Sequence, residues 1–357
     1  MKRIAIKIGS NVLTKKNGTP DYTRMSALVD QIAELHSDGI EIILVSSGAV
    51  AAGRNVCKND KIDTVSARQL FSAVGQAKLI SRYYQLFSDH DIVCGQVLTT
   101  KESLSTRYSY LNQRNCMQVM VDNGVMPIVN ENDTISVTEL MFTDNDELSG
   151  MIAAMMNCEK LIILSNIDGI YNGNPADKQS KVIDKVLPRR RDLSKYIQTG
   201  KSSFGRGGMQ TKTDIASKVA DEGIEVIIAN GKKDNILINL VNDIDNTVCT
   251  RFIASPGKVS GVKKWIAHSE GFAKGEIHLN ECVSKQIADD NSVLSILPVG
   301  VISIEGNFEK DDIVKIFNFI GDEIGVGKIS CSSNEARKVI GTKGKKPLIH
   351  YDYLYLF

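Results

Sequence analysis

The sequence lacks any cysteine pattern that would build a disulfide framework or a zinc site. Its seven cysteines are scattered over 357 residues, odd in number and never spaced as CxxC. Disulfide-rich secreted domains use paired cysteines and zinc knuckles use close pairs, so both classes are excluded. Unpaired cysteines are most simply explained by a reducing cellular compartment, so we expect a cytoplasmic protein.

Long apolar runs and an excess of one charge are missing as well. No apolar run approaches the roughly 20 residues of a membrane helix, and the start of the chain is too interrupted for a secretion signal. Lys and Arg number 43 against 42 Asp and Glu, a formal net charge of +1. This balance gives no general attraction to nucleic acid or to membranes, so ligands must be inferred from local motifs.

Apolar runs and helical periodicities alternate over about the first 250 residues. This alternation predicts a mostly parallel sheet between two layers of helices, a three-layer αβα sandwich of the α/β class. The expected strands are residues 4–8, 41–45, 92–98, 125–129, 160–164 and 223–230. The expected helices are residues 22–38, 66–87, 108–123, 148–156 and 209–220.

The pattern changes after Ser255-Pro256-Gly257, a plausible boundary. Short strand-like runs follow, broken by Gly, Asp and Asn, and they predict a small β-barrel. These runs are residues 275–279, 293–297, 301–305, 313–319 and 323–330. We therefore expect an α/β domain at residues 1–254, a linker at 255–271 and a β domain at 272–350.

Two clusters of amides and carboxylates follow the apolar run at 125–129. The first spans residues 130–133 (NEND) and the second residues 144–146 (DND). Such side chains bind an amino group, position a magnesium ion or steer a phosphate, because they offer hard oxygen ligands and hydrogen-bonding partners. The alternative is a polar turn with helix caps, which Asn and Asp also favour.

Three further stretches suit an anionic ligand. Lys7 lies in an apolar strand, where it must be neutralised or reach a cleft beyond the strand's carboxyl end, unless the strand is an edge with a solvated lysine. Small residues at 46–53 are expected to begin a helix. They favour either an anion-binding site at the helix N-terminus or close packing of the start of the helix. The Gly- and Ser-rich basic loop at 199–208 suits polyphosphate, with plain flexibility as the alternative, and the P-loop, Rossmann and protein-kinase signatures are absent.

Six motifs in series resemble the glutamate 5-kinase branch of the amino-acid kinase family, which carries a C-terminal PUA domain. They are IKIGSNVL, VSSGAVAAG, VNENDT, TDNDELS, LSNIDGIY and GRGGMQTK. The resemblance spans essentially the whole chain. It implies the amino-acid kinase fold, ATP and Mg²⁺ as cofactors, and transfer of the γ-phosphoryl group to the side-chain carboxylate of L-glutamate, the first step toward proline.

The resemblance also implies roles for individual residues. Lys7 and Lys212 contact the transferring phosphate, and Asp146 holds their ammonium groups in place. Glutamate is bound by Ser47, Gly48, Asn130, Asp133 and Asn145, with Asp133 suited to its ammonium group. The nucleotide site comprises Lys7, Gly9, Ser165, Asn166, Arg206, Gly207, Gly208, Met209, Gln210, Thr211 and Lys212. Asp144 is the candidate for helping with Mg²⁺, which keeps several waters and bridges the ATP phosphates.

Two departures from the family pattern stand out. Ser165-Asn166 replaces the usual Thr/Ser-Asp, which removes a negative charge and puts ATP affinity in question. The tail at residues 350–357 (HYDYLYLF) is apolar and aromatic where relatives are polar, so we expect it to pack on the barrel or on another subunit.

Two other functions are compatible with this architecture. An RNA-associated PUA protein with a regulatory kinase-like half is disfavoured, because residues 270–346 hold about ten Lys and Arg against about twelve Asp and Glu. A local basic patch remains at Lys338, Lys343, Lys345 and Lys346. Another acid substrate, such as acetylglutamate, aspartate, carbamate or UMP, is the third hypothesis. The family further suggests a homo-oligomer, dimer or tetramer, and proline as a feedback inhibitor.

Overall fold

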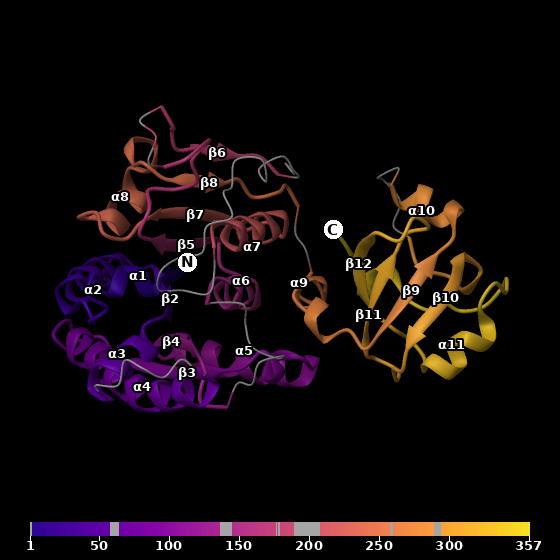
Figure 1. The fold of residues 1–357 in the computed structure, drawn as a ribbon, viewed down its shortest axis with the longest axis horizontal. Coiled ribbons are helices and arrows are strands. Elements are labelled where there is room, and N and C mark those ends of the chain that lie inside the picture. Colours follow the sequence, from indigo (N-terminus) through magenta and orange to yellow (C-terminus); the bar gives the residue numbers. More distant parts are fainter. Residues whose placement is uncertain are drawn as a thin grey trace. The chain divides into compact units, whose positions relative to one another are not determined.

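A computed structural model describes residues 2–57, 64–135, 145–175, 177, 179–188, 208–257, 260–288 and 294–357. The chain divides into two compact units, Met1–Lys258 and Val259–Phe357 (Figure 1). Helix α9 (Gly261–Ala267) lies within the stretch expected to be a linker and packs on elements of the second unit. Within the described part of the chain, no helix is both long and apolar enough to cross a membrane.

The first unit is built on an eight-stranded sheet. Its strands are, in spatial order, β3 (Cys94–Thr99), β4 (Met126–Glu131), β2 (Glu41–Ser46), β1 (Arg3–Ile8), β5 (Lys160–Ser165), β7 (Glu225–Asn230), β8 (Thr250–Phe252) and β6 (Lys185–Val186). Neighbouring strands are parallel, apart from the antiparallel pair β7–β8. The predicted mostly parallel sheet is confirmed, and the short strands β6 and β8 are additions to it.

Helices cover both faces of this sheet, which confirms the predicted three layers (Figure 1). They are α1 (Ser10–Leu13), α2 (Tyr22–Ser37), α3 (Ala49–Cys57), α4 (Val65–Ser88), α5 (Arg107–Asp122), α6 (Asn145–Met155), α7 (Met209–Asp221) and α8 (Ile236–Asn242). Short 3-10 turns add η1 (Glu102–Leu104) and η3 (Ile244–Asn246). Helices α1, α2 and α8 lie on one face, and α5, α6 and α7 lie on the other (Figure 1).

Two glycines let α3 and α4 approach closely. A Cβ atom on Gly53 would lie 1.8 Å from the carbonyl oxygen of Phe71, and one on Gly75 would lie 1.8 Å from that of Ala49. Side chains are therefore sterically impossible at both positions without a shift of backbone. The small residues at 46–53 thus have a packing role at the start of α3.

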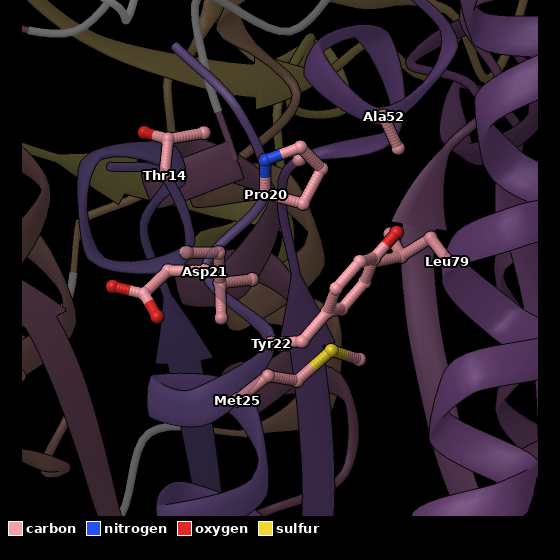
Figure 2. A pocket seen from close by; sticks show the side chains of 9 residues that line it. Thr14, Pro20, Asp21, Tyr22, Met25, Ala52 and Leu79 are labelled. Carbon is pink, nitrogen blue, oxygen red and sulfur yellow. The ribbon is translucent and has the colours of Figure 1, made fainter. Parts of the chain in front are cut away.

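A small apolar pocket lies between α1–α2 and α3–α4. Figure 2 shows Tyr22, Met25 and Leu79 among the residues that line it. Its one charged residue, Asp21, caps α2 by accepting a hydrogen bond from the Arg24 backbone N–H. The pocket therefore offers packing space rather than a polar binding site.

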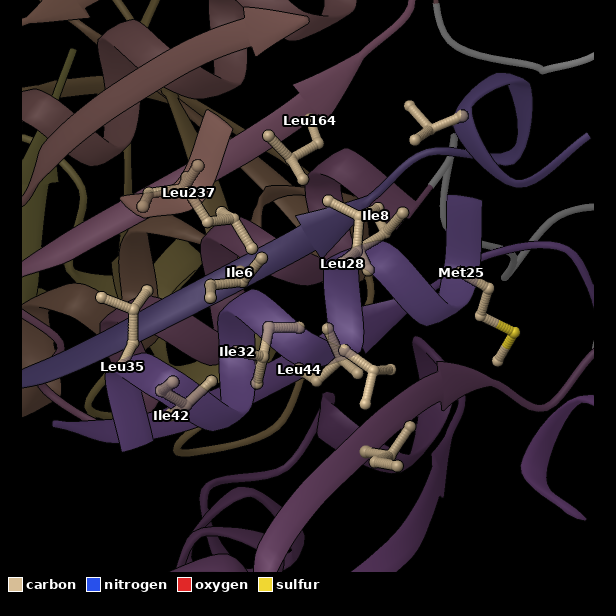
Figure 3. Close-up of a cluster of buried hydrophobic side chains, with 14 of the residues drawn as sticks. Ile6, Ile8, Met25, Leu28, Ile32, Leu35, Ile42, Leu44, Leu164 and Leu237 are labelled. Atoms are coloured by element: carbon tan, nitrogen blue, oxygen red, sulfur yellow. The ribbon is translucent and has the colours of Figure 1, made fainter. Parts of the chain in front are cut away.

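The main core lies between the sheet and α2 (Figure 3). Met25, Leu28, Ile32 and Leu35 recur at helical spacing and are buried against the strands. On β1, Ile4, Ile6 and Ile8 join this cluster. Successive side chains of a strand point to opposite faces, so Lys7 lies on the other face, toward α6.

The second unit has a five-stranded sheet. Its order is β10 (Val301–Gly306), β9 (Gly275–Leu279), β11 (Ile313–Phe317), β12 (Glu323–Lys328) and β13 (Leu354–Leu356). Strands β9 and β11 are parallel, and the other neighbours are antiparallel. Besides α9, the unit contains α10 (Glu281–Ala288), α11 (Ser333–Val339), η4 (Glu270–Phe272), η5 (Pro298–Gly300) and η6 (Tyr351–Tyr353).

The separate β domain is confirmed, with one strand misplaced. Residues 294–297 of the expected strand 293–297 hold only an isolated bridge, between Ile296 and Ile349. The fifth strand is instead supplied by the aromatic tail, where Leu354–Leu356 pairs with β12. The tail therefore packs on its own domain, the first of the two alternatives.

Candidate active site

The candidate site lies where the carboxyl ends of the central strands meet the start of α6. Strands β4, β2, β1 and β5 are neighbours and all parallel, so their carboxyl ends share one edge of the sheet. Open α/β sheets place ligands at this edge. Most of the predicted site residues whose structure is described come from these strand ends or from the first turns of α6 and α7.

Lys7, Asp146 and Lys212 form one ion-paired group. Lys7 Nζ donates to Asp146 Oδ1, and Lys212 Nζ lies 2.8 Å from Asp146 Oδ2. Asp146 is fully buried and Lys7 is 4% exposed. Strand β1 is central in the sheet, so the solvated edge-strand alternative for Lys7 is wrong.

The charge of this group favours an anion. Two ammonium groups share a single carboxylate, which leaves one positive charge in a region largely shielded from water. Asp146 also lies in the first turn of α6, where the helix dipole favours a negative side chain. The group therefore holds two lysines close together and keeps a net attraction for phosphate.

Asn145 links the ends of two other strands. Its Nδ2 donates to Ser47 Oγ at 2.8 Å and to Asn130 Oδ1 at 2.9 Å, and lies 3.3 Å from the Ser46 carbonyl oxygen. Asn130 Nδ2 in turn donates to Gln76 Oε1 on α4 at 2.8 Å. The structure thus brings together three residues that the resemblance assigns to glutamate and adds Gln76.

Asp133 has a partner that sequence reasoning missed. Its carboxylate accepts a hydrogen bond from Arg68 Nη2 on α4. Burial raises the pKa of Asp133, and the ion pair and hydrogen bond with Arg68 oppose that rise without cancelling it. An ammonium group binding to Asp133 would therefore meet Arg68 at the same carboxylate.

Two glycines shape the ends of β1 and β2. The backbone N–H of Gly9 donates to the Leu164 carbonyl oxygen at 3.1 Å. A Cβ atom on Gly9 would lie 3.0 Å from that oxygen, a tight contact, and 3.6 Å from Lys7 Nζ, an ordinary van der Waals contact. Gly48 has a φ of +107°, a conformation that other residues rarely adopt.

Two of the residues that the resemblance assigns to the nucleotide lie at the end of β5. Ser165 is buried at the end of β5 and Asn166 is exposed next to it. Nearby, Asp168 accepts a hydrogen bond from Asn230 Nδ2 at 2.8 Å and pairs with Lys233 Nζ at 3.1 Å. Burial raises the pKa of Asp168, but these two partners outweigh it, so the pKa lies below its usual value.

The loop before α7 is only partly described. Gly208 is the N-cap of α7. The first turn of this helix comprises Met209, Gln210 and Thr211, and Lys212 follows directly. Gln210 Nε2 donates to Asp214 Oδ1 at 2.7 Å. Arg206, Gly207 and the magnesium candidate Asp144 lie outside the described residues.

Comparison with known proteins supports the resemblance at two levels. Residues 2–230 match the model of the amino acid kinase family, and residues 275–351 match that of the PUA domain. Glutamate 5-kinase of Bacteroides thetaiotaomicron is 67% identical over 355 residues, covering 99% of this chain and 98% of that protein. Glutamate 5-kinase of Chlorobaculum tepidum is 44% identical over 360 residues, covering 99% and 97%.

A solved structure shares the fold of the first unit. Carbamate kinase from Giardia lamblia bound to AMP-PNP aligns with a TM-score of 0.53 at 17% identity, over 71% of this chain and 99% of that one. At this identity the likeness concerns the fold alone. Together with the sequence matches, it leads to one conclusion: the chain belongs to the amino acid kinase family and carries a C-terminal PUA domain.

Proposed function

We propose that this protein transfers the γ-phosphoryl group of ATP to the side-chain carboxylate of L-glutamate, giving γ-glutamyl phosphate for proline biosynthesis. The observation that carries the proposal is the buried group of Lys7, Asp146 and Lys212. The extensive identity to two glutamate 5-kinases supports the choice of acceptor.

The reaction joins two anions, so the enzyme must supply positive charge around the moving phosphoryl group. Lys7 and Lys212 meet this need, and Asp146 keeps the two ammonium groups together against their mutual repulsion. Because the charges are in place before the substrates bind, no reorganisation is required during the transfer.

The acceptor needs no general base. A glutamate side-chain carboxylate is already ionised at neutral pH, given an ordinary pKa of about 4.3. Its oxygen attacks the γ-phosphorus while the bond from that phosphorus to the β-γ bridging oxygen breaks. ADP leaves with the electron pair of that bond, and the lysines stabilise the charge that moves with it.

Glutamate is held by the polar network at the ends of β2 and β4. Ser47, Asn130 and Asn145 supply hydrogen-bonding groups, and the Gly48 backbone N–H is offered to an anionic oxygen. Asp133 binds the substrate ammonium group. This ammonium group either shares the Asp133 carboxylate with Arg68 or displaces Arg68 from it.

ATP is held by the opposite part of the site. Lys7, Gly9 and residues 206–212 hold the phosphates, and Ser165 and Asn166 contact the nucleotide. Mg²⁺, when bound, neutralises phosphate charge and keeps several water ligands, with Asp144 as the proposed protein contact. Asn166 offers an amide in place of a carboxylate, so its contact with the nucleotide is a neutral hydrogen bond.

The direct test is to incubate the full chain with ATP, Mg²⁺ and L-glutamate in the presence of hydroxylamine. An acyl phosphate is a mixed anhydride that this nucleophile intercepts, so we expect γ-glutamyl hydroxamate together with ADP. A phosphorylated alcohol would not be trapped. Hydroxamate and ADP should form in equal amounts and require both ATP and glutamate.

Parallel reactions separate the alternatives. Aspartate, acetylglutamate and carbamate replace glutamate in the same assay, and UMP is assayed by formation of UDP. Reaction with one of these in preference to glutamate would assign a different acceptor to the same fold. Failure with every acceptor, combined with tight RNA binding, would replace the enzyme proposal by the RNA-associated alternative.

We also infer, from the same resemblance, a cytoplasmic homo-oligomer that proline inhibits at or beside the glutamate site. Light scattering on the purified chain distinguishes monomer, dimer and tetramer. Proline should raise the apparent KM for glutamate more than that for ATP. A monomer, or inhibition that follows ATP instead, would contradict these inferences.

A further inference from the structure

Three metal-ligating side chains meet on the sheet of the second unit. Glu276 and His278 are two residues apart on β9 and so share one face, and Glu305 on β10 is the register partner of Glu276. His278 Nε2 lies 3.6 Å from Glu276 Oε2 and 3.8 Å from Glu305 Oε1. One ligand atom from each residue lies within 4.8 Å of the others. Figure 1 shows β9 between β10 and β11.

The imidazole of His278 is held in position by packing. Its ring stacks on Phe317 of β11, its register partner on that side, with centroids 4.9 Å apart and an interplanar angle of 17°. Its Nε2 is shielded from solvent and has no hydrogen-bond partner among the described residues. A shielded polar atom without a partner is uncommon in native proteins, and here it faces two carboxylates.

Among the described residues, the cluster itself brings together two carboxylates and one imidazole. Glu276 and Glu305 face each other across an antiparallel pair, where like charges are destabilising. Lys315 on β11 is the register partner of Glu276 on the other side; its Nζ pairs with Glu323 at 2.7 Å, and its charge also acts on Glu276.

We propose that Glu276, His278 and Glu305 bind a divalent transition metal ion, with Zn²⁺ as the ion to test. Tetrahedral zinc with bonds of about 2.0–2.2 Å places its ligands roughly 3.4 Å apart. The two distances from His278 Nε2, 3.6 and 3.8 Å, are close to this value. One imidazole with two carboxylates suits zinc or a similar ion, whereas Ca²⁺ and Mg²⁺ prefer oxygen ligands alone. Water completes the coordination, and the metal joins β9 to β10.

The test is calorimetric titration of ZnCl₂ into the full chain after treatment with a chelator. We expect a site of one-to-one stoichiometry, and binding should raise the Tm of the second unit because the metal binds the folded state. Co²⁺ titrated in parallel should give a visible spectrum without the intense thiolate band that a cysteine site would add. Neither readout depends on phosphoryl transfer, so the result is independent of the proposed kinase activity.

Three variants locate the site. Glu305→Gln and His278→Gln should each weaken Zn²⁺ binding at least about tenfold, because even the loss of a partner outside the ligand set typically costs about 10- to 100-fold in metal affinity. Glu305 is well exposed, so its substitution does not threaten the fold. His350→Gln is the matched control, because His350 lies beside Asp352 in the same unit but outside the cluster. This control should bind like the parent.

Two results would overturn the proposal. One is the absence of saturable Zn²⁺ binding in the parent. The other is Zn²⁺ binding that Glu305→Gln and His278→Gln leave unchanged.

Discussion

Replacing Asp146 by Asn tests whether its charge organises the two lysines. The substitution keeps the size and hydrogen-bonding capacity of the side chain and removes only the negative charge. In the parent, Lys7 and Lys212 bond to opposite oxygens of this buried carboxylate. In the variant the two ammonium groups face each other across a neutral amide.

The structure sets the scale of the effect. The two nitrogens lie within roughly 7 Å of each other, so they repel by about 2–3 kcal/mol at an effective dielectric constant of about 20. Removing one partner of a buried ion pair typically costs about 3–5 kcal/mol. Lys212 retains 12% side-chain exposure and has room to turn toward water, so we expect the lower end. A loss of about 3 kcal/mol lowers the Tm of a unit of this size by roughly 6–12 °C.

The effect on catalysis should be larger than the loss of stability explains. Removing one preorganised electrostatic element typically costs about 10²- to 10³-fold in kcat. The hydroxamate assay, run well below the Tm of the variant, measures this. Adding Lys212→Met to Asp146→Asn removes the repulsion, so the double variant should regain most of the lost Tm without regaining kcat.

Two results would refute this reasoning. One is a single variant with near-normal kcat and an unchanged Tm. The other is a double variant in which kcat recovers together with the Tm, because the group would then serve stability alone.

The remaining predictions concern the glutamate site, the packing of α3 on α4, and the domain division. Only the ionised form of Asp133 binds an ammonium group, and Arg68 opposes the rise of the Asp133 pKa. Arg68→Met should therefore move the acidic limb of the pH profile of kcat/KM for glutamate to higher pH. A limb that stays in place or moves to lower pH would contradict the pairing. Gly75→Ala should lower the Tm severely, because its Cβ would lie 1.8 Å from the Ala49 carbonyl oxygen. The control Gly261→Ala has an ordinary φ and nothing within 4 Å of the added Cβ, so equal effects would refute the packing argument. A chain truncated after residue 258 should fold and phosphorylate glutamate, since the first unit contains every proposed site residue; an insoluble or inactive product would mean that the second unit completes the site.

Most of the first unit could be predicted because its elements carry strong periodic patterns. The apolar spacing on α2 and the apolar run of β1 each match a burial pattern that the structure confirms. Strands β6 and β8 were missed because two or three residues are too short for a periodic signal. The misplaced strand at 293–297 was an apolar run, and such runs do not by themselves distinguish a paired strand from a buried connection.

The site was less predictable because its contacts join elements that are far apart in the sequence. The family resemblance identified Lys7, Asp146 and Lys212 as site residues, but it did not identify Arg68 or Gln76. Both residues lie in α4, whose periodic pattern indicates only which face is apolar. Their partners, Asp133 and Asn130, are 65 and 54 positions away in the sequence. A polar residue in such a helix gives no sign of its partner before the tertiary structure is known.

The first turn of α6 joins the two halves of the proposed reaction. Asn145 is tied to Ser47 and Asn130 on the acceptor side, and the next residue, Asp146, is tied to both lysines on the phosphoryl side. Because the two residues are adjacent in one helical turn, neither contact set is free to shift without moving the other. The spacing between acceptor and phosphoryl group therefore depends on the geometry of a single helix terminus, which gives a physical reason for the sequence Asn-Asp at this point.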